Sequence, residues 1–329
     1  MLIYEYKLDG NTAQYAAIDE AIRVVQFIRN KCVRLWMDTR GISKKGYPQF
    51  QHNNRSVEYK TTGWKLDRDG RHITFTDGCG IGRLRLVGNK QQKIEAFPPK
   101  QIKRVRIVHR ADGYYCQFSV QADRKIAHIP TARQIGIDVG LKAFYTDSEG
   151  NAVENPRFLH KAEKQLKRLH RRVSKKQKQS ANRNKARKRL AKAYLKVQRQ
   201  REDFARKTAS TLTTSSDLVA YEHLQIPNLV KNHKLAKSIS DAAWGRFLRW
   251  VNYYGELHAI PVLAIAPQFT TQDCSGCGKR VWKSLSVRTH ACPHCGLVLD
   301  RDHNAALNIL EKALDGTGGH SGTDAPMRA

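Results

Sequence analysis

The chain has 329 residues, of which 59 are lysine or arginine and 29 are aspartate or glutamate, so its formal net charge is +30 at pH 7. A length of about 100–200 residues per domain predicts two or three domains. No apolar run reaches the ~20 residues that a membrane span needs, and the first residues do not resemble a signal peptide. We therefore expect a cytoplasmic protein with no membrane partner, whose excess charge meets a polyanion, by default nucleic acid.

The first 124 residues predict a small β-barrel with a helical insertion after its first strand. Residues 1–8 alternate between apolar and polar side chains, as a strand does. Residues 13–37 repeat apolar side chains at intervals of three and four, as an amphipathic helix does. Short strands bounded by turns are expected at 56–59, 72–76, 82–87, 103–108 and 114–120.

A second, α/β unit is expected after the predicted linker at 124–132. Apolar segments predict strands at 135–140, 142–146, 217–222 and 261–267. An amphipathic helix is expected at 238–258, and a final helix begins near residue 300. The fold class is therefore a multidomain α+β protein with a barrel followed by an α/β domain.

Residues 158–205 predict a basic antiparallel helical hairpin. Apolar residues from Leu159 to Val173 recur at alternating intervals of three and four, a heptad seam. Between residues 161 and 201 there are 18 lysines or arginines and one acid, Glu163. A solvated face is the usual explanation of a charge run, but the near absence of acids favours a nucleic-acid contact. The candidate contacts are Lys167, Arg168, Arg171, Arg172, Lys175, Lys176, Arg183, Lys185, Arg187, Lys188 and Arg189.

Four of the seven cysteines form two C-x2-C pairs separated by 14 residues, namely Cys274, Cys277, Cys292 and Cys295. Four thiolates complete the tetrahedral shell of a structural Zn²⁺, and this spacing is close to that of paired C-x2-C zinc sites. Because the shell is then full, His290 and His294 are expected to be surface residues. Cys32, Cys79 and Cys116 are expected to be small buried apolar residues.

Three carboxylates stand out by their context. Asp138 lies within an apolar strand, Glu222 ends another, and Asp302 opens a helix. A buried acid is costly unless it is neutralised, and two Mg²⁺ ions held by three carboxylates can catalyse phosphodiester hydrolysis. Each acid also has a structural alternative: Asp138 could pair with a buried arginine, Glu222 could be exposed, and Asp300 or Asp302 could cap the helix.

These motifs together resemble the TnpB family of transposon-encoded RNA-guided DNA endonucleases, which are related to type V CRISPR effectors. The resemblance rests on Gly136-Ile-Asp-Val-Gly140, Glu154-Asn-Pro-Arg-Phe-Leu159, Tyr221-Glu222, the two cysteine pairs, and Asp300-Arg-Asp-His-Asn304 followed by two alanines. It implies that Asp138, Glu222 and Asp302 are the catalytic residues that hold Mg²⁺, because the family's third acid lies two residues before the asparagine. It also implies a guide RNA and double-stranded target DNA as partners.

The resemblance implies a division of the chain into domains. A wedge-like barrel would comprise 1–9 and 48–123, with a recognition insertion at 10–47 and a linker at 124–133. A RuvC-like nuclease domain with an RNase H-like fold would comprise 134–270 and 298–315, interrupted by a four-cysteine zinc finger at 271–297, and 316–329 would be a disordered tail. The family usually has more helical sequence between the first recognition helix and the Pro-x-Phe stretch, here Pro48–Phe50, so the insertion is predicted to be shortened.

Two alternatives to an RNA-guided endonuclease stay open from the sequence. One is a guide-RNA-dependent DNA-binding protein with weak or no cleavage, which the shortened insertion would favour and the three acids disfavour. The other is an RNase H-like transposase that acts without RNA. The sequence leaves monomer or dimer undecided.

Overall fold

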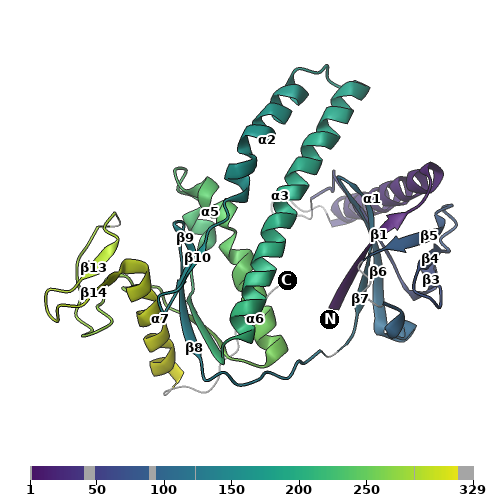
Figure 1. Ribbon diagram of the computed structural model, residues 1–329. Coiled ribbons are helices and arrows are strands. Elements are labelled where there is room, and N and C mark those ends of the chain that lie inside the picture. Colours follow the sequence, from purple (N-terminus) through teal and green to yellow (C-terminus); the bar gives the residue numbers. More distant parts are fainter. Residues whose placement is uncertain (1, 41–48, 89–93, 123, 285, 318–329) are drawn as a thin grey trace. The chain divides into compact units, whose positions relative to one another are not determined.

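The computed structural model describes residues 2–40, 49–88, 94–122, 124–284 and 286–317 (Figure 1). The chain divides into two compact units, Met1–Asp123 and Arg124–Ala329. Each unit has its own sheet and its own hydrophobic core. No helix in the described ranges is long and apolar enough to cross a membrane.

Unit 1 is built on an antiparallel sheet of seven strands in the order β2-β6-β7-β1-β5-β4-β3. The strands are β1 (Leu2–Asp9), β2 (Ser56–Tyr59), β3 (Trp64–Leu66), β4 (His72–Phe75), β5 (Gly82–Val87), β6 (Ile102–Arg110) and β7 (Gly113–Val120). Alternate residues of these strands, such as Val105, Ile107, Cys116 and Phe118, form its core. Among the described residues the end strands β2 and β3 do not pair with each other, so closure into a barrel stays a prediction.

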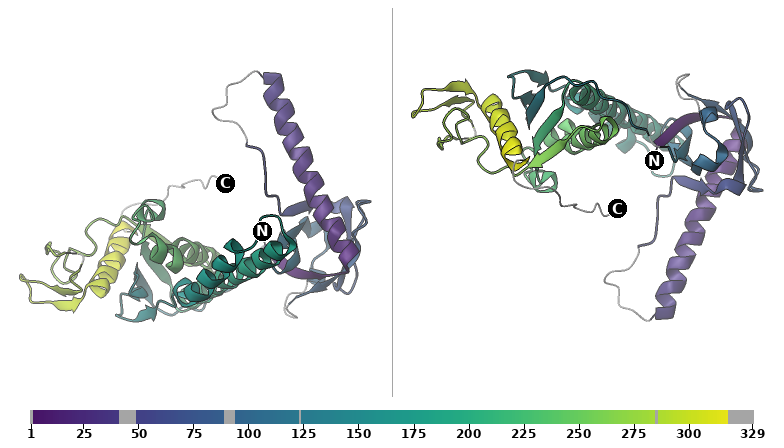
Figure 2. Two further views of the ribbon diagram at one scale, coloured as in Figure 1. Left: turned by 90° about the horizontal axis from the view of Figure 1, so that it is seen from above. Right: turned by 90° about the horizontal axis from the view of Figure 1, so that it is seen from below.

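Helix α1 (Thr12–Arg40) follows β1, as its apolar periodicity predicts. Its first half buries Ile18, Ala21 and Ile22 against the sheet. Its second half runs on past the sheet (Figure 2), where Phe27 and Leu35 are exposed. The segment 41–48, on which the predicted shortening of the insertion depends, lies outside the described residues.

Unit 2 contains a five-stranded sheet in the order β10-β9-β8-β11-β12. The strands are β8 (Gln134–Val139), β9 (Ala143–Asp147), β10 (Ala152–Glu154), β11 (Leu218–Glu222) and β12 (Val262–Ile265). Strands β8, β9 and β10 form an antiparallel meander, whereas β11 runs parallel to both β8 and β12. Because β8 and β11 are parallel, their carboxyl ends lie at the same edge of the sheet.

Helices cover both faces of this sheet (Figure 1). The lower part of α3 (Ala181–Thr214) and α6 (Trp244–His258) pack on one face, where Ile137 and Val219 join Ala209 and Phe247 in a core. The other face carries α7 (Arg301–Thr317), whose Ile309 and Ala313 pack on Leu218 and Ala220. Two short helices, α4 (Ile226–Leu229) and α5 (Ala236–Ala242), connect β11 to α6.

The predicted basic hairpin consists of α2 (Phe158–Ser174) and the upper part of α3, which lie side by side in Figures 1 and 2. The apolar seam faces inward, with Leu166 and Val197 buried. Ser180 begins α3 by accepting a hydrogen bond from the amide of Arg183 at 3.1 Å. A single polar N-cap of this kind stabilises a helix by about 1 kcal/mol.

Several expectations about individual residues are wrong. The helix expected at 238–258 is broken at Ala243, which has φ 57°, and becomes α5 and α6. Cys116 is buried as expected, but Cys32 and Cys79 are exposed, because they lie on the outer side of α1 and in a surface turn. Gly316, expected in a disordered tail, is still part of α7.

Gly136 of β8 makes the close approach of α7 possible. A Cβ at this position would lie 2.3 Å from the carbonyl oxygen of Ala306 and 2.8 Å from the amide of Leu310. Both atoms are helix backbone and cannot rotate away, so any larger residue must push α7 off the sheet.

We predict that Gly136→Ala lowers the free energy of unfolding by about 3 kcal/mol, the upper range for overpacking a core, as measured by urea denaturation. The matched control is Gly245→Ala in α6, whose added Cβ would meet only the end of the Ile226 side chain at 3.1 Å. That variant should be neutral or gain up to about 1 kcal/mol. Equal stability of the two variants would contradict the close approach at Gly136.

Candidate active site and nucleic-acid interface

Asp138, Glu222 and Asp302 lie at one edge of the unit 2 sheet. Tyr221 of β11 pairs with Ile137 of β8, so the next residues along these parallel strands, Glu222 and Asp138, are neighbours. Alternation along β8 puts Asp138 on the same face as Gly136, the face that α7 covers. Glu222 shares that face with Leu218 and Ala220, both in contact with α7. The two strands therefore direct both acids toward α7.

Helix α7 brings the third acid to the same place. Asp302 lies one turn before Ala306, whose backbone touches Gly136, and a Cβ on Gly140 would lie 3.9 Å from Asp302 Oδ2. Asp300 caps the helix, because its Oδ1 accepts a hydrogen bond from the amide of Asp302 at 2.8 Å. The N-cap alternative thus applies to Asp300, and the side chain of Asp302 is not used as the cap.

The three carboxylates are buried and repel one another. Asp138 and Glu222 are each 9% exposed and Asp302 is 7% exposed. Burial raises the pKa of Asp138 well above its usual range, and the charges of Glu222 and Asp302 raise it further, while Arg301 and Arg288 act in the opposite direction. Burial also raises the pKa of Glu222, against a lowering by the Thr270 hydroxyl and by Lys312. A group of acids under such repulsion is suited to a cation.

Glu222 and Asp302 each accept hydrogen bonds from neighbouring side chains. The Thr270 hydroxyl donates to Glu222 Oε1. Asp302 accepts hydrogen bonds from Arg288 Nη1 at 3.2 and 3.3 Å and from Arg301 Nη2 at 3.0 Å. Arg288 comes from the segment between the two cysteine pairs, so that segment reaches the acid site.

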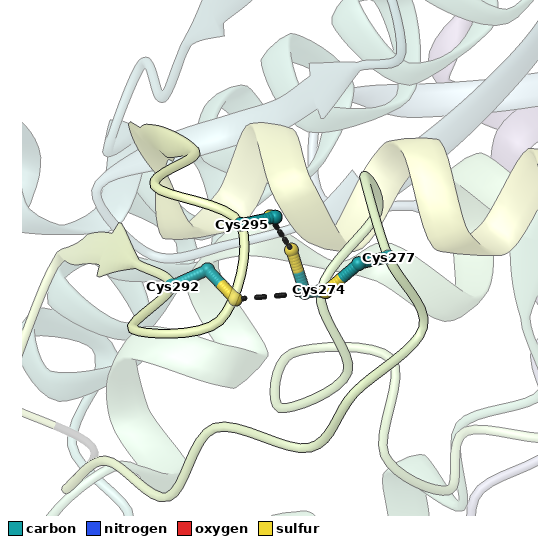
Figure 3. A group of neighbouring side chains, drawn as sticks. All are labelled: Cys274, Cys277, Cys292 and Cys295. Carbon is teal, nitrogen blue, oxygen red and sulfur yellow. Dashed lines mark hydrogen bonds between the residues drawn. The ribbon is translucent and has the colours of Figure 1, made fainter.

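The four predicted cysteines gather into one cluster, with ligand atoms all within 4.8 Å of one another (Figure 3). The Sγ atoms of Cys274 and Cys295 are 3.6 Å apart, and those of Cys277 and Cys292 are 3.7 Å apart. Tetrahedral Zn²⁺ with Zn–S bonds of about 2.3 Å separates its sulfurs by about 3.8 Å, so the cluster fits zinc.

Each pair of cysteines sits on a tight backbone turn. The amide of Gly278 donates to the carbonyl of Cys274 at 2.8 Å, and that of Gly296 to the carbonyl of Cys292 at 3.0 Å. Both glycines have positive φ, 71° and 77°, a conformation that favours glycine. The backbone turns therefore direct both sulfurs of each pair to one side.

Two buried asparagines connect this cluster to α7. Asn304 accepts a hydrogen bond from the amide of Ser275 at 3.0 Å and donates to the carbonyl of Asp273 at 2.8 Å. Asn308 donates to the carbonyls of Thr270 and Asp273, each at 2.7 Å. The helix that carries Asp302 is thus bonded to the chain on both sides of Cys274.

The expectation of a surface position is wrong for His290, which is fully buried with its Nδ1 against Lys283 Nζ. It lies in the middle of β13 (Thr289–Ala291), which pairs with β14 (Val298–Asp300), and its partner in the register is Leu299. His294 is exposed, as expected.

Beyond the cysteines, one other group in the described ranges brings three metal-type ligand atoms within 4.8 Å, namely Asp67, Asp69 and His72. There Asp67 is already paired with Arg83 at 2.7 Å. The ligand oxygens of Asp138, Glu222 and Asp302 do not all lie within this limit.

The predicted basic contacts are exposed along the hairpin, except for Arg183. Arg183 Nη1 donates to the carbonyls of Val173 and Lys176 at 3.2 and 2.9 Å, so this residue closes the tip. A groove of about 590 Å³ follows one face of α2, lined by Lys161, Lys164, Gln165, Arg168, Arg171, Arg172 and Lys175. A second groove of about 380 Å³, between α2 and α3, includes Arg172, Lys176, Lys185 and Arg189.

Sequence reasoning missed Thr270, Arg288 and Arg301 as partners of the acids. Thr270 and Arg288 carry no periodic or spacing signal, since they reach the acids across 48 and 14 residues of chain. Arg301 stands next to Asp302, so its role could have been suspected from adjacency alone.

Two family models match the chain. One, described as probable transposase, matches residues 117–233, and the other, the Cas12f1-like TNB domain, matches 244–309. A protein of Streptomyces pristinaespiralis named "Putative RNA-guided DNA endonuclease" is 37% identical over 186 residues, which are 56% of this chain and 46% of that protein. A protein of Escherichia coli (strain K12) named "Putative RNA-guided DNA endonuclease InsQ" is 25% identical over 284 residues, which are 81% of this chain and 68% of that protein.

The solved complex of Cas12f1 with its sgRNA and target DNA aligns with a TM-score of 0.48 and 16% identity, over 81% of this chain and 62% of that one. The chain spans about half the length of the Streptomyces relative, since the match covers 46% of that protein.

We predict that Asp138→Asn stabilises the protein at pH 7 in the absence of Mg²⁺. Because the folded state raises the pKa of Asp138, the folded state binds its proton more tightly, and stability is lost as pH rises above the ordinary value near 3.8. Asparagine does not ionise, so its midpoint of thermal unfolding should exceed wild type by about 3 °C or more at pH 7, with the difference shrinking toward pH 4.

Asp203→Asn is the control, since Asp203 is half exposed and pairs with Lys207 on the helix surface. Its midpoint should stay within about 1 °C of wild type. A lower midpoint for Asp138→Asn at pH 7 would mean that a positive charge compensates Asp138.

Proposed function

We propose that the chain is a TnpB-type RNA-guided DNA endonuclease, which uses Asp138, Glu222 and Asp302 to hydrolyse phosphodiester bonds of target DNA beside a short recognition motif. The observation that carries this proposal is the meeting at one sheet edge of three acids that are spread over more than 160 residues of sequence. Buried acids that only stabilise a fold are paired with cations one by one, whereas the largest charge effects on the pKa of Asp138 come from two other acids, Glu222 and Asp302.

The three carboxylates would hold Mg²⁺ ions, which stabilise the attacking and leaving oxygens of the phosphodiester when bound. The donor set fits, because Mg²⁺ prefers carboxylate oxygens and near-octahedral sites completed by water and phosphate. The role of Thr270 is to orient Glu222, and that of Asp300 is to fix the first turn of α7 beneath Asp302. Arg288 is 44% exposed in its side chain, so it can move from Asp302 to a phosphate.

The basic hairpin would hold the guide RNA and its DNA partner. Its cations lie along α2 at one or two per turn, a rise of about 5.4 Å, which suits a row of phosphates. RNA and DNA partners are also what the names of the relatives indicate for those proteins. The zinc ion proposed for the four cysteines would be structural, since thiolates fill its shell.

We predict that Asp138→Ala, Glu222→Ala and Asp302→Asn each lower the cleavage rate by about 1000-fold or more, because each removes a metal ligand. The measurement is cleavage of a DNA library, carrying sites that match the RNA purified with the protein, in Mg²⁺. Affinity for that RNA should stay within about twofold of wild type.

Asp300→Asn is the matched control, because asparagine keeps the oxygen that caps α7, and its rate should stay close to wild type. Full cleavage by an acid variant would remove that residue from the site. Absence of any bound RNA, or of any cleavage by wild type, would overturn the proposed function.

We predict one zinc ion per chain in metal analysis of the purified protein, and less than about a tenth of that in Cys277→Ser, since three thiolates hold zinc far less tightly than four. Cys79→Ser, an exposed cysteine of unit 1, should keep its zinc. Loss of zinc should also expose 271–300 to proteolysis. A stoichiometric zinc content in Cys277→Ser would contradict the four-thiolate site.

A further inference from the structure

Helix α2 begins without a cap of its own. Arg157, the residue before it, has φ 48°, and no side chain nearby in sequence accepts from the first turn. The first amides of a helix need hydrogen-bond acceptors. Here the carboxylate of Asp241, a residue of α5 that is distant in sequence, supplies these acceptors. Leu159 N donates to its two oxygens at 2.9 and 3.0 Å, and His160 N donates at 3.2 Å.

The same carboxylate also binds the other helix of the hairpin. Arg201 of α3 donates to Asp241 Oδ1 from Nε at 3.0 Å and from Nη2 at 2.7 Å. The side chain of Asp241 is only 8% exposed, and the positive end of the α2 dipole adds to the attraction. One buried carboxylate therefore ties the start of α2 to the middle of α3.

The start of α2 and the middle of α3, where the hairpin leaves the rest of unit 2, are here called the root of the hairpin. Further contacts fix this root. Glu163, the lone acid of the basic stretch, pairs with Lys237 of α5 at 2.7 Å. Glu202 of α3 accepts from Arg246 at 2.7 Å and from Trp250 Nε1 at 2.6 Å, both on α6. The acids of the hairpin root thus serve to hold it against α5 and α6, which lie beside it in Figure 1.

The root is in turn fixed to the strands that carry the acid site. Phe247 of α6 packs against Phe144 of β9, with ring centroids 4.9 Å apart. Asn252 of α6 donates to the hydroxyl of Tyr221 at 2.9 Å, and Tyr221 precedes Glu222. A continuous set of contacts therefore runs from Asp241 through α6 to the sheet edge.

We propose that Asp241 is a positioning residue for cleavage: it fixes the direction in which the basic hairpin leaves unit 2, and so the place where nucleic acid bound along α2 meets Asp138, Glu222 and Asp302. This inference rests on the proposed function. The 17 residues of α2 span about 26 Å, so a tilt of about 5° at the root moves the far end by about 2 Å. A misplacement of about 1 Å at a reacting centre can cost about 100-fold in rate.

Asp241→Asn tests this role with little change of shape. The amide keeps one oxygen for the α2 amides but loses the charge that faces Arg201. Asp203→Asn is the matched control, because it removes the same charge from α3 while its partners, Arg206 and Lys207, lie on the helix surface. Should Asp241→Asn fail to fold, Glu202→Gln loosens the same root through Arg246 and Trp250.

The first measurement separates binding from cleavage. We expect Asp241→Asn to bind the guide RNA and target within about twofold of the control, because no basic residue of the groove is changed, and to cut about 100-fold more slowly in single turnover at saturating target. Cleavage at the control's rate overturns the inference. A parallel loss of affinity and rate also overturns it, because that result describes a structural role only.

The second measurement does not depend on activity. Hydrogen exchange of the amides of Leu159 and His160 should be about tenfold faster in Asp241→Asn than in Asp203→Asn, since their acceptor is weakened. Unchanged exchange overturns the anchoring itself. A wild-type protein that cuts no DNA overturns the proposed function instead, so the two failures are distinguishable.

Discussion

The contact between Gly136 of β8 and the backbone of α7 is the constraint on which the acid site depends. Because this position has no side chain, the carbonyl oxygen of Ala306 can lie 2.3 Å from where a Cβ would be. Asp302, one helical turn earlier in α7, then lies close to Gly140, which follows the end of β8, the strand that carries Asp138. The cost is electrostatic, because three carboxylates meet in a place with little exposure to solvent. Packing of α7 on Leu218 and the other apolar residues of that face supplies the compensating free energy.

Charge is distributed to match this arrangement. The chain has a net charge of +30, of which +17 lies between residues 161 and 201. The acid site is therefore a small negative region in a protein whose net charge is positive. Arg288 and Arg301 form direct ion pairs with Asp302, and their charges only partly oppose the raised pKa of Asp138. A polyanion drawn by the hairpin would reach a site that is negative only over a few ångströms, since screening limits longer reach to about 8 Å at physiological salt.

Local patterns in the sequence predicted the elements whose determinants are local. The seam of the hairpin around Leu166 follows from heptad spacing, and the cysteine cluster follows from its paired spacing. Contacts between distant segments could not be predicted, because no periodicity marks them: the break at Ala243, the burial of His290 and the Thr270–Glu222 hydrogen bond all depend on how separate segments pack. The gathering of the acids was expected from family resemblance, whereas composition alone left each with a structural alternative.

Helix α3 is long enough to connect the tip of the basic hairpin to the core of unit 2 in one continuous helix. Its 34 residues form one rod of about 51 Å, whose upper part lies along α2 and whose lower part, with Ala205 and Ala209, is embedded in the core of the sheet. The rod ends four residues before β11, the strand that carries Glu222. A force applied at the hairpin tip would therefore be transmitted along α3 to its junction with β11, the strand that carries Glu222.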